Sequence, residues 1–219
     1  MKYPTVLWDL DGTILNSSPG VFDCFRRTFQ QIGLPSMTDE QMRPFMGPPL
    51  KASFGSLGLN QAQVNECLEI YRDFYLNQGG AINAHLYPGV IETLELSKHQ
   101  GRTLSLATSK AERGTKLVGE HFDFLKYFDV MGTASNDLTR HSKSEVLSCA
   151  LDELQKLGAD LTNPILIGDR IHDVEGAKEH GIEVVLVKWG FGTTEEWNQA
   201  DHLVENAKEL QQLLGLETN

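Results

Sequence analysis

Five short apolar runs, separated by longer polar and helical stretches, set the pattern of this chain. They are rich in Val, Ile and Leu, as is typical of strands buried on both faces of a parallel sheet. Helical spacing of apolar residues predicts helices over 143–157 and 172–180. Strands that alternate with helices predict an α/β fold with a doubly wound parallel sheet of about five strands. The predicted strands are 5–10 (TVLWDL), 103–108 (TLSLAT), 128–133 (FDVMGT), 164–169 (PILIGD) and 183–188 (EVVLVK).

The interval between the first two strands is too long for a simple crossover. About 90 residues separate them, where a few tens would be enough. Residues 18–80 contain helical patterns and little strand character. We therefore expect a small helical domain over 17–83, inserted into a sheet domain formed by 1–16 and 84–219.

Composition and charge narrow the class of protein. The 219 residues are 40% hydrophobic and 22% charged, which is typical of a packed globular chain. A net charge of -11 disfavours nucleic acid polymers and anionic membrane surfaces as partners. No apolar stretch approaches the ~20 residues that a membrane span needs, and the start lacks a signal-peptide pattern. We expect a cytoplasmic protein, a monomer or weak homodimer, whose sparse cysteines are reduced: Cys24, Cys67 and Cys149.

Polar residues follow three of the predicted strands. The carboxyl ends of parallel strands meet at one edge, and ligands of open α/β sheets bind there. Clustered carboxylates resist ionisation unless a cation joins them, and oxygen ligands suit magnesium. The cluster therefore predicts a metal ion. These residues are Asp9 and Asp11 after the first strand, Thr108 and Ser109 after the second, and Asp169 with Asp173 after the fourth.

Asp9 and Asp11 are spaced for two cooperating roles. Residues two apart on an extended strand face the same side, and Gly12 permits a tight turn after them. One carboxylate could attack phosphorus, while the other protonates the leaving group and later deprotonates water. Asp-x-Asp-Gly alone also fits a simple turn after a strand.

Thr108, Ser109 and Lys143 are candidates for binding phosphate. Thr108 and Ser109 precede a helix, whose N-terminus favours anions, although either would equally suit an N-cap. Lys143 opens the helix 143–157, where the helix dipole disfavours a cation. A bound phosphate or the aspartates would compensate, and a solvated surface lysine is the alternative. Asp173 also has a simpler alternative, as a helix cap.

Four ordered motifs, taken together, resemble those of the haloacid dehalogenase superfamily. The similarity runs from the first strand to about Trp197 and implies a Rossmann-like sheet with an inserted α-helical cap. By resemblance, LYPGV at 86–90 is the exit hinge of this cap, whose closure would exclude water. The motifs are WDLDGT, LATSK, SKSEVL and IGDRIHDVEGAKEHGI.

The resemblance implies a role for each motif residue. Asp9 would be the nucleophile and Asp11 the acid/base, while Thr108 binds and Lys143 neutralises the transferring phosphoryl group. The implied Mg²⁺ ligands are Asp9, Asp11 (through its backbone carbonyl), Asp169 and Asp173. The implied reaction is hydrolysis of a small phosphorylated metabolite through an aspartyl-phosphate.

Further segments resemble the phosphoglycolate phosphatase-like branch, from which Asn16 departs because that branch often has Asp there. GDRIHD is similar to relatives that act on nucleoside monophosphates, which leaves a nucleotidase as an alternative. The branch segments are DGTILNSSPGV, FMGPPL and WGFGTTEEW. Cap residues would set specificity, and the candidates are Arg43, Gly47, Lys51 and Tyr71.

Other functional classes fit less well. The turn after the first strand has neither G-x-G-x-x-G nor a P-loop, so dinucleotide and P-loop binding are excluded. Carbon–halogen hydrolysis has no need of an acid at Asp11. A sugar phosphomutase could use the same core. A non-catalytic phosphoacceptor or binding module is the remaining alternative, and the long helical insert argues against it.

Overall fold

The computed structural model describes residues 1–137 and 139–216. Its contacts divide the chain into a sheet unit, residues 1–16 and from 86 onward, and a helical unit, Ser17–His85. Two short strands, β2 (Leu15–Asn16) and β3 (His85–Leu86), pair where the chain leaves and re-enters the sheet unit. The sequence placed the return to the sheet domain at residue 84, two residues before Leu86.

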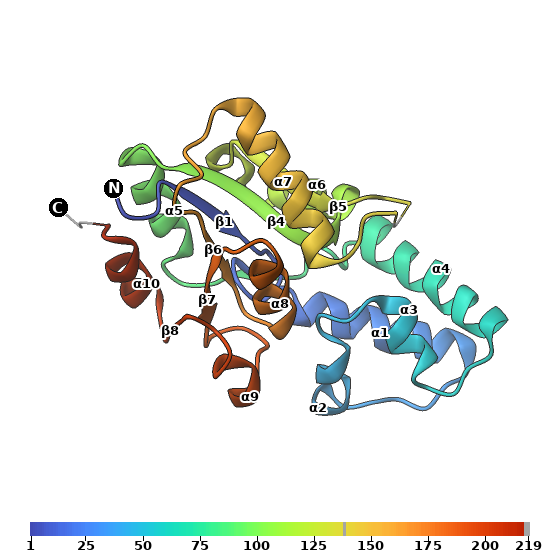
Figure 1. The fold of residues 1–219 in the computed structure, drawn as a ribbon. Helices are drawn as coiled ribbons and strands as arrows, with labels where there is room; N and C mark the ends of the chain where they lie inside the picture. Colours follow the sequence, from blue (N-terminus) through green and yellow to red (C-terminus); the bar gives the residue numbers. More distant parts are fainter. Residues whose placement is uncertain (138, 217–219) are drawn as a thin grey trace. The chain divides into compact units, whose positions relative to one another are not determined.

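The sheet unit contains six parallel strands in the order β5-β4-β1-β6-β7-β8 (Figure 1). From β1 the chain builds outward to β5, then returns to the other side of β1 with β6, so the order reverses between β1 and β6. The doubly wound α/β fold is confirmed, with one strand more than expected. β8 escaped prediction because it has three residues, of which Leu203 is exposed. The strands are β1 (Thr5–Trp8), β4 (Thr103–Ala111), β5 (Val130–Ala134), β6 (Ile165–Gly168), β7 (Glu183–Val187) and β8 (His202–Val204).

Helices flank this sheet. α7 and α8 contact each other, and Val146, Leu147 and Val174 pack with Leu7 and Leu166 in one buried apolar cluster. α5 contacts both β4 and α10. The predicted helix 143–157 is confirmed, and the one predicted over 172–180 begins and ends one residue earlier. The helices are α5 (Val90–His99), α6 (Glu112–His121), η2 (Leu125–Tyr127), α7 (Lys143–Leu157), α8 (Ile171–Glu179), α9 (Thr194–Trp197) and α10 (Ala207–Leu214).

The helical unit has its own aromatic core. The ring of Phe25 lies 5.1 Å from that of Phe54 and 5.0 Å from that of Tyr71, between centroids. α1 begins with a proline in its first turn and ends at Gly33, which adopts the left-handed conformation with φ 74°. Its elements are α1 (Ser18–Ile32), α2 (Asp39–Met42), η1 (Arg43–Phe45), α3 (Leu50–Gly55) and α4 (Gln61–Asn77).

No helix among the described residues of either unit combines the length and apolar character needed to cross a membrane.

Candidate active site

Asp9 and Lys143 form a buried ion pair at the carboxyl end of β1. The backbone N–H of Asp9 donates to the carbonyl of Ile167 at 2.8 Å, which continues the pairing of β1 with β6. Lys143 Nζ lies 2.6 Å from Asp9 Oδ1 and donates to the carbonyl of Ala107 at 2.7 Å. The two side chains are 5% and 10% exposed. Lys143 is therefore not a solvated surface lysine, and it lies beside the predicted nucleophile.

The local structure of α7 and α8 brings Lys143 to this position. Ser142 caps α7, since its hydroxyl accepts the N–H of Glu145, so Lys143 is the first helical residue. α8 passes close by because Gly176 has no side chain: a Cβ there would lie 2.7 Å from Lys143 Cγ. The aspartates offset the unfavourable interaction of a cation with the start of the helix dipole.

Asp173 both caps α8 and takes part in the cluster. Its Oδ2 accepts the backbone N–H groups of Asp169 and Arg170, each at 3.0 Å. Its Oδ1 lies 2.7 Å from Lys143 Nζ. The Asp173 side chain therefore takes part in the capping box of α8 and also contacts Lys143, while its role as a metal ligand stays a prediction. Gly168 makes room for it, because a Cβ there would lie 2.2 Å from Asp173 Cγ.

Asp169, directly after β6, is fully buried. Its Oδ2 accepts the N–H of Phe191 at 2.6 Å, whereas its Oδ1 has no hydrogen-bond partner among the residues that the structure describes. Carboxylate oxygens of Asp9, Asp169 and Asp173 all lie within 4.8 Å of one another. A buried carboxylate oxygen without a partner is costly unless something binds it. This set of hard oxygen donors fits a magnesium ion.

Burial and mutual repulsion disfavour the ionised forms of the clustered carboxyl groups when no cation is bound. The pKa of Asp9 is raised to about 7, because burial, together with repulsion from Asp173 and Asp11, outweighs the opposing attraction of Lys143. Burial also raises the pKa of Asp169, with added repulsion from Asp173 and Asp9. Burial disfavours the charge of Lys143, but attraction to Asp173 and Asp9 outweighs it and leaves the Lys143 pKa raised. A divalent cation would relieve the repulsion among these carboxylates.

Asp11 faces a different partner from Asp9. Its carboxylate is bound by Lys110 Nζ, at 2.7 and 3.0 Å from its two oxygens. Its side chain does not belong to the group of three clustered carboxylates. Gly12, which follows it, has φ 90°, as the expected tight turn requires.

Thr108 and Ser109 occupy different environments at the end of β4. Thr108 is 1% exposed and its hydroxyl accepts the N–H of Lys110 at 3.2 Å, whereas Ser109 is exposed. Sequence reasoning missed the side chain of Lys110. The available signal was its place two residues after Thr108, on a strand that pairs directly with β1.

Comparison with known proteins places the chain in a family. A model of the haloacid dehalogenase-like hydrolase family matches residues 6–187. The chain belongs to this family. The expected resemblance to this family is thereby confirmed.

Two relatives and one solved structure illustrate the range of proteins that are similar to this chain. The tyrosine-protein kinase PtkA of Mycobacterium tuberculosis is 37% identical over 187 residues, or 85% of this chain, which spans 62% of that relative's length. A 5'-nucleotidase of Pseudomonas aeruginosa is 30% identical and covers 98% of this chain and 96% of its own. The crystal structure of a predicted phosphatase from Clostridium acetobutylicum, 30% identical, has a TM-score of 0.87 and covers 99% and 100%.

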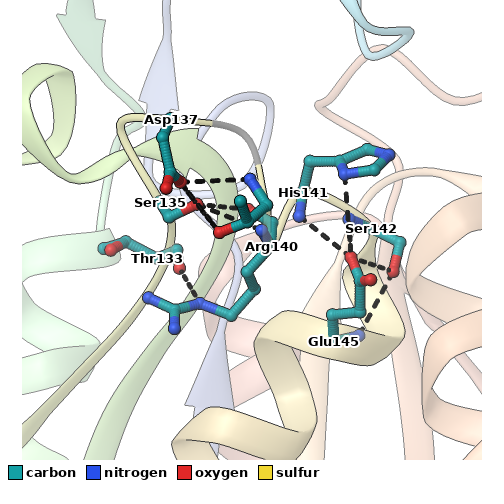
Figure 2. A network of polar contacts seen from close by, with 8 residues as sticks. Thr133, Ser135, Asp137, Arg140, His141, Ser142 and Glu145 are labelled. Carbon is teal, nitrogen blue, oxygen red and sulfur yellow. Dashed lines mark hydrogen bonds and ion pairs between the residues drawn. The ribbon is translucent and has the colours of Figure 1, made fainter.

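Polar contacts connect the loop after β5 to the strand before it and to the helix after it (Figure 2). Arg140 Nε donates to the carbonyl of Thr133 at 2.8 Å, and its own carbonyl accepts the N–H of Ser135 at 2.9 Å. On the helix side, Glu145 accepts the N–H of Ser142 at 2.9 Å. These contacts tie the loop to the end of β5 and to the first turn of α7, where Lys143 begins the helix.

The specificity candidates all lie in the helical unit. Arg43 in η1, Gly47 and Lys51 are exposed, and Gly47 has φ 102°. Tyr71 is only 3% exposed and packs in the aromatic core of this unit. Packing in this core explains why Tyr71 is present without a role in specificity. Substrate-binding roles for Arg43 and Gly47 stay predictions.

Proposed function

We propose that this protein is a magnesium-dependent phosphatase that hydrolyses small phosphorylated metabolites through an aspartyl-phosphate formed on Asp9. The observation that carries the proposal is the cluster itself: the ammonium of Lys143 lies 2.6 Å from Asp9 and 2.7 Å from Asp173. A cation and several carboxylates at the strand edge suit a phosphoryl group that must be held and attacked.

In the first step, an Asp9 carboxylate oxygen forms a bond to phosphorus and the bond from phosphorus to the ester oxygen breaks. The departing alkoxide takes a proton from the Asp11 carboxyl. Lys143 and the hydroxyl of Thr108 hold the phosphoryl oxygens, with Ser109 at the same strand end. Lys143 also favours the ionised, nucleophilic form of Asp9, because its attraction opposes the raised pKa of that carboxyl.

In the second step, the Asp11 carboxylate takes a proton from water. The water oxygen attacks phosphorus, the bond to Asp9 breaks, and inorganic phosphate leaves. Asp9 and Asp11 thereby return to their starting states, so the cycle balances in protons and phosphate.

Magnesium would be held by Asp9, Asp169 and Asp173, with the backbone carbonyl of Asp11. When bound, it supplies positive charge that stabilises the developing charge on the phosphoryl oxygens. The orphaned Oδ1 of Asp169 and the raised pKa values of Asp9 and Asp169 support this assignment.

A nucleoside 5'-monophosphate is a second candidate substrate. The 5'-nucleotidase of Pseudomonas aeruginosa supports it, because it aligns over nearly the whole of both chains. The phosphoglycolate-like branch rests on the sequence resemblance, and a sugar phosphomutase would use the same first step. The similarity to the tyrosine-protein kinase PtkA makes phosphoryl transfer to protein tyrosine a further alternative. We propose a small metabolite rather than a polyanion as substrate, because a net charge of -11 repels polyanions. We also propose a cytoplasmic location.

The test is turnover of p-nitrophenyl phosphate by the purified protein with Mg²⁺ and with a chelator. We expect activity that requires the metal and falls roughly a thousandfold or more in Asp9→Asn, because the nucleophile is lost. Wild-type turnover equal to that of Asp9→Asn, or unaffected by chelation, would contradict the proposal. A panel of phosphorylated metabolites, with inorganic phosphate and isomers both measured, then separates phosphatase, nucleotidase and mutase.

A further inference from the structure

Lys110, on the neighbouring strand β4, forms an ion pair with the carboxylate of Asp11. Its Nζ lies 2.7 and 3.0 Å from the two oxygens, so the ammonium contacts both ends of the carboxylate. The Lys110 side chain is 9% exposed and that of Asp11 is 28% exposed. Two-point contact in a largely buried place fixes the orientation of a carboxylate far better than an exposed pair would.

An irregularity in β4 places Lys110 in this position. β4 and β5 pair in regular register up to Thr108 and Thr133, and the register then shifts before Ala111 pairs with Ala134. An irregularity of this kind interrupts the ladder locally and changes the direction of the side chains within it. The hydroxyl of Thr108 accepts the Lys110 N–H at 3.2 Å and so stabilises the bulge.

Asp11 therefore depends on another strand for its direction. It follows β1 in the turn through Gly12, and its backbone pairs in an isolated bridge with Leu15. An acid/base group must point within hydrogen-bond reach of the atom whose proton it moves. The contact that sets the direction of the Asp11 side chain is the ammonium of Lys110.

We propose that Lys110 is a positioning residue for the acid/base Asp11, and that it matters most when Asp11 takes a proton from the attacking water. This inference rests on the proposed function. It assigns Lys110 no contact with the substrate: the lysine acts through Asp11, by pairing with its charge and fixing its plane.

The experiment uses p-nitrophenyl phosphate, whose leaving group needs little help from an acid, so the second step limits turnover. For Lys110→Met we expect kcat to fall about tenfold or more, a modest share of what acid–base catalysis contributes. KM should fall with it, leaving kcat/KM nearly unchanged, and a burst of p-nitrophenolate should precede the slow steady state. Lys110→Arg, which restores the charge, should recover most of kcat.

A double-mutant cycle tests whether Lys110 acts through Asp11. Lys110→Met should add no further loss in the Asp11→Asn background, because the group that it positions is already removed. Additive losses would overturn the inference. So would an equal fall in kcat and kcat/KM, which indicates general structural damage, or a rise in KM alone, which indicates a substrate-binding lysine.

Lys98→Met is the matched control. Lys98 makes the same two-point contact with Asp129, at 2.8 and 2.7 Å, but from the end of α5. It should keep wild-type kinetics, and thermal unfolding of both variants shows whether each is folded. Absence of metal-dependent turnover in the wild type sinks the proposed function. Normal wild-type turnover with an unchanged Lys110→Met sinks this inference alone.

Discussion

The backbone N–H of Phe191 donates a 2.6 Å hydrogen bond to Oδ2 of Asp169. The two residues follow different strands, β7 and β6, so this bond joins two loops at one edge of the sheet. It occupies one oxygen of the buried carboxylate, while Oδ1 has no hydrogen-bond partner within residues 1–137 and 139–216. The loop after β7 thus orients the carboxylate that we assign to the metal.

Gly190→Ala should weaken Mg²⁺ binding. A Cβ at Gly190 would lie 2.4 Å from Asp169 Cβ and 2.5 Å from the carbonyl oxygen of Gly12, so the loop or the carboxylate must move. We expect a loss of tenfold or more in affinity, within the roughly 10 to 100-fold typical of residues that orient metal ligands. Calorimetric titration with Mg²⁺ measures it.

Gly55→Ala is the control for this substitution, because a Cβ there meets nothing within 4 Å and Gly55 has no positive φ. It should bind Mg²⁺ as the wild type does. Wild-type affinity in Gly190→Ala would show that the loop does not orient Asp169.

Binding of Mg²⁺ should release protons near neutral pH. The pKa of Asp9 is raised to about 7 and that of Asp169 is also raised, so the metal-free protein retains protons that a cation must displace. Affinity should therefore rise with pH up to and beyond 7. Titration at pH 6.5 in two buffers of different ionisation enthalpy should give different apparent enthalpies, and the difference should shrink at higher pH. Equal apparent enthalpies in the two buffers at pH 6.5 would contradict the prediction that Mg²⁺ displaces protons from the carboxyl groups.

The same shifts set the sign of stability against pH in the metal-free protein. A carboxyl whose folded pKa is raised binds more protons folded than unfolded. Its contribution to stability is therefore greatest below its unfolded pKa of about 4, and declines as pH rises through the folded value of about 7 for Asp9.

Lys143→Met should destabilise the metal-free protein, and more at pH 8 than at pH 6. The substitution leaves the carboxylates of Asp9 and Asp173 without the ammonium that lies 2.6 and 2.7 Å away. Loss of one partner in a buried pair costs about 3 kcal/mol in the free energy of unfolding. At pH 6 Asp9, whose pKa is raised to about 7, takes up a proton and the cost falls. Urea unfolding in the presence of a chelator measures both values.

Lys156→Met is the comparison for that prediction. Lys156 pairs with Glu153 on the exposed face of α7, where loss of an ion pair has little effect. A loss for Lys143→Met that does not depend on pH would show that Asp9 does not take up a proton near neutral pH.

The amino-acid sequence by itself determined the elements and the acidic edge of the sheet. Apolar runs located five of the six strands, and helical spacing located α7 at 143–157, because both patterns depend on residues near one another in the chain. The positions of Asp9, Asp169 and Asp173 followed from the rule that parallel strands end at a common edge. Their grouping within 4.8 Å agrees with it.

Only the tertiary structure decided which side chains meet. Lys110 and Asp11 are 99 residues apart, and Lys143 and Asp9 are 134 apart, so their contacts depend on strand order and on a bulge that no local pattern encodes. The hydrogen bond from Phe191 to Asp169 likewise requires Gly190 and Gly192, because a Cβ at either position would clash with Asp169. The sequence identifies the reacting groups at the strand ends, whereas packing between distant segments determines their charge, burial and direction.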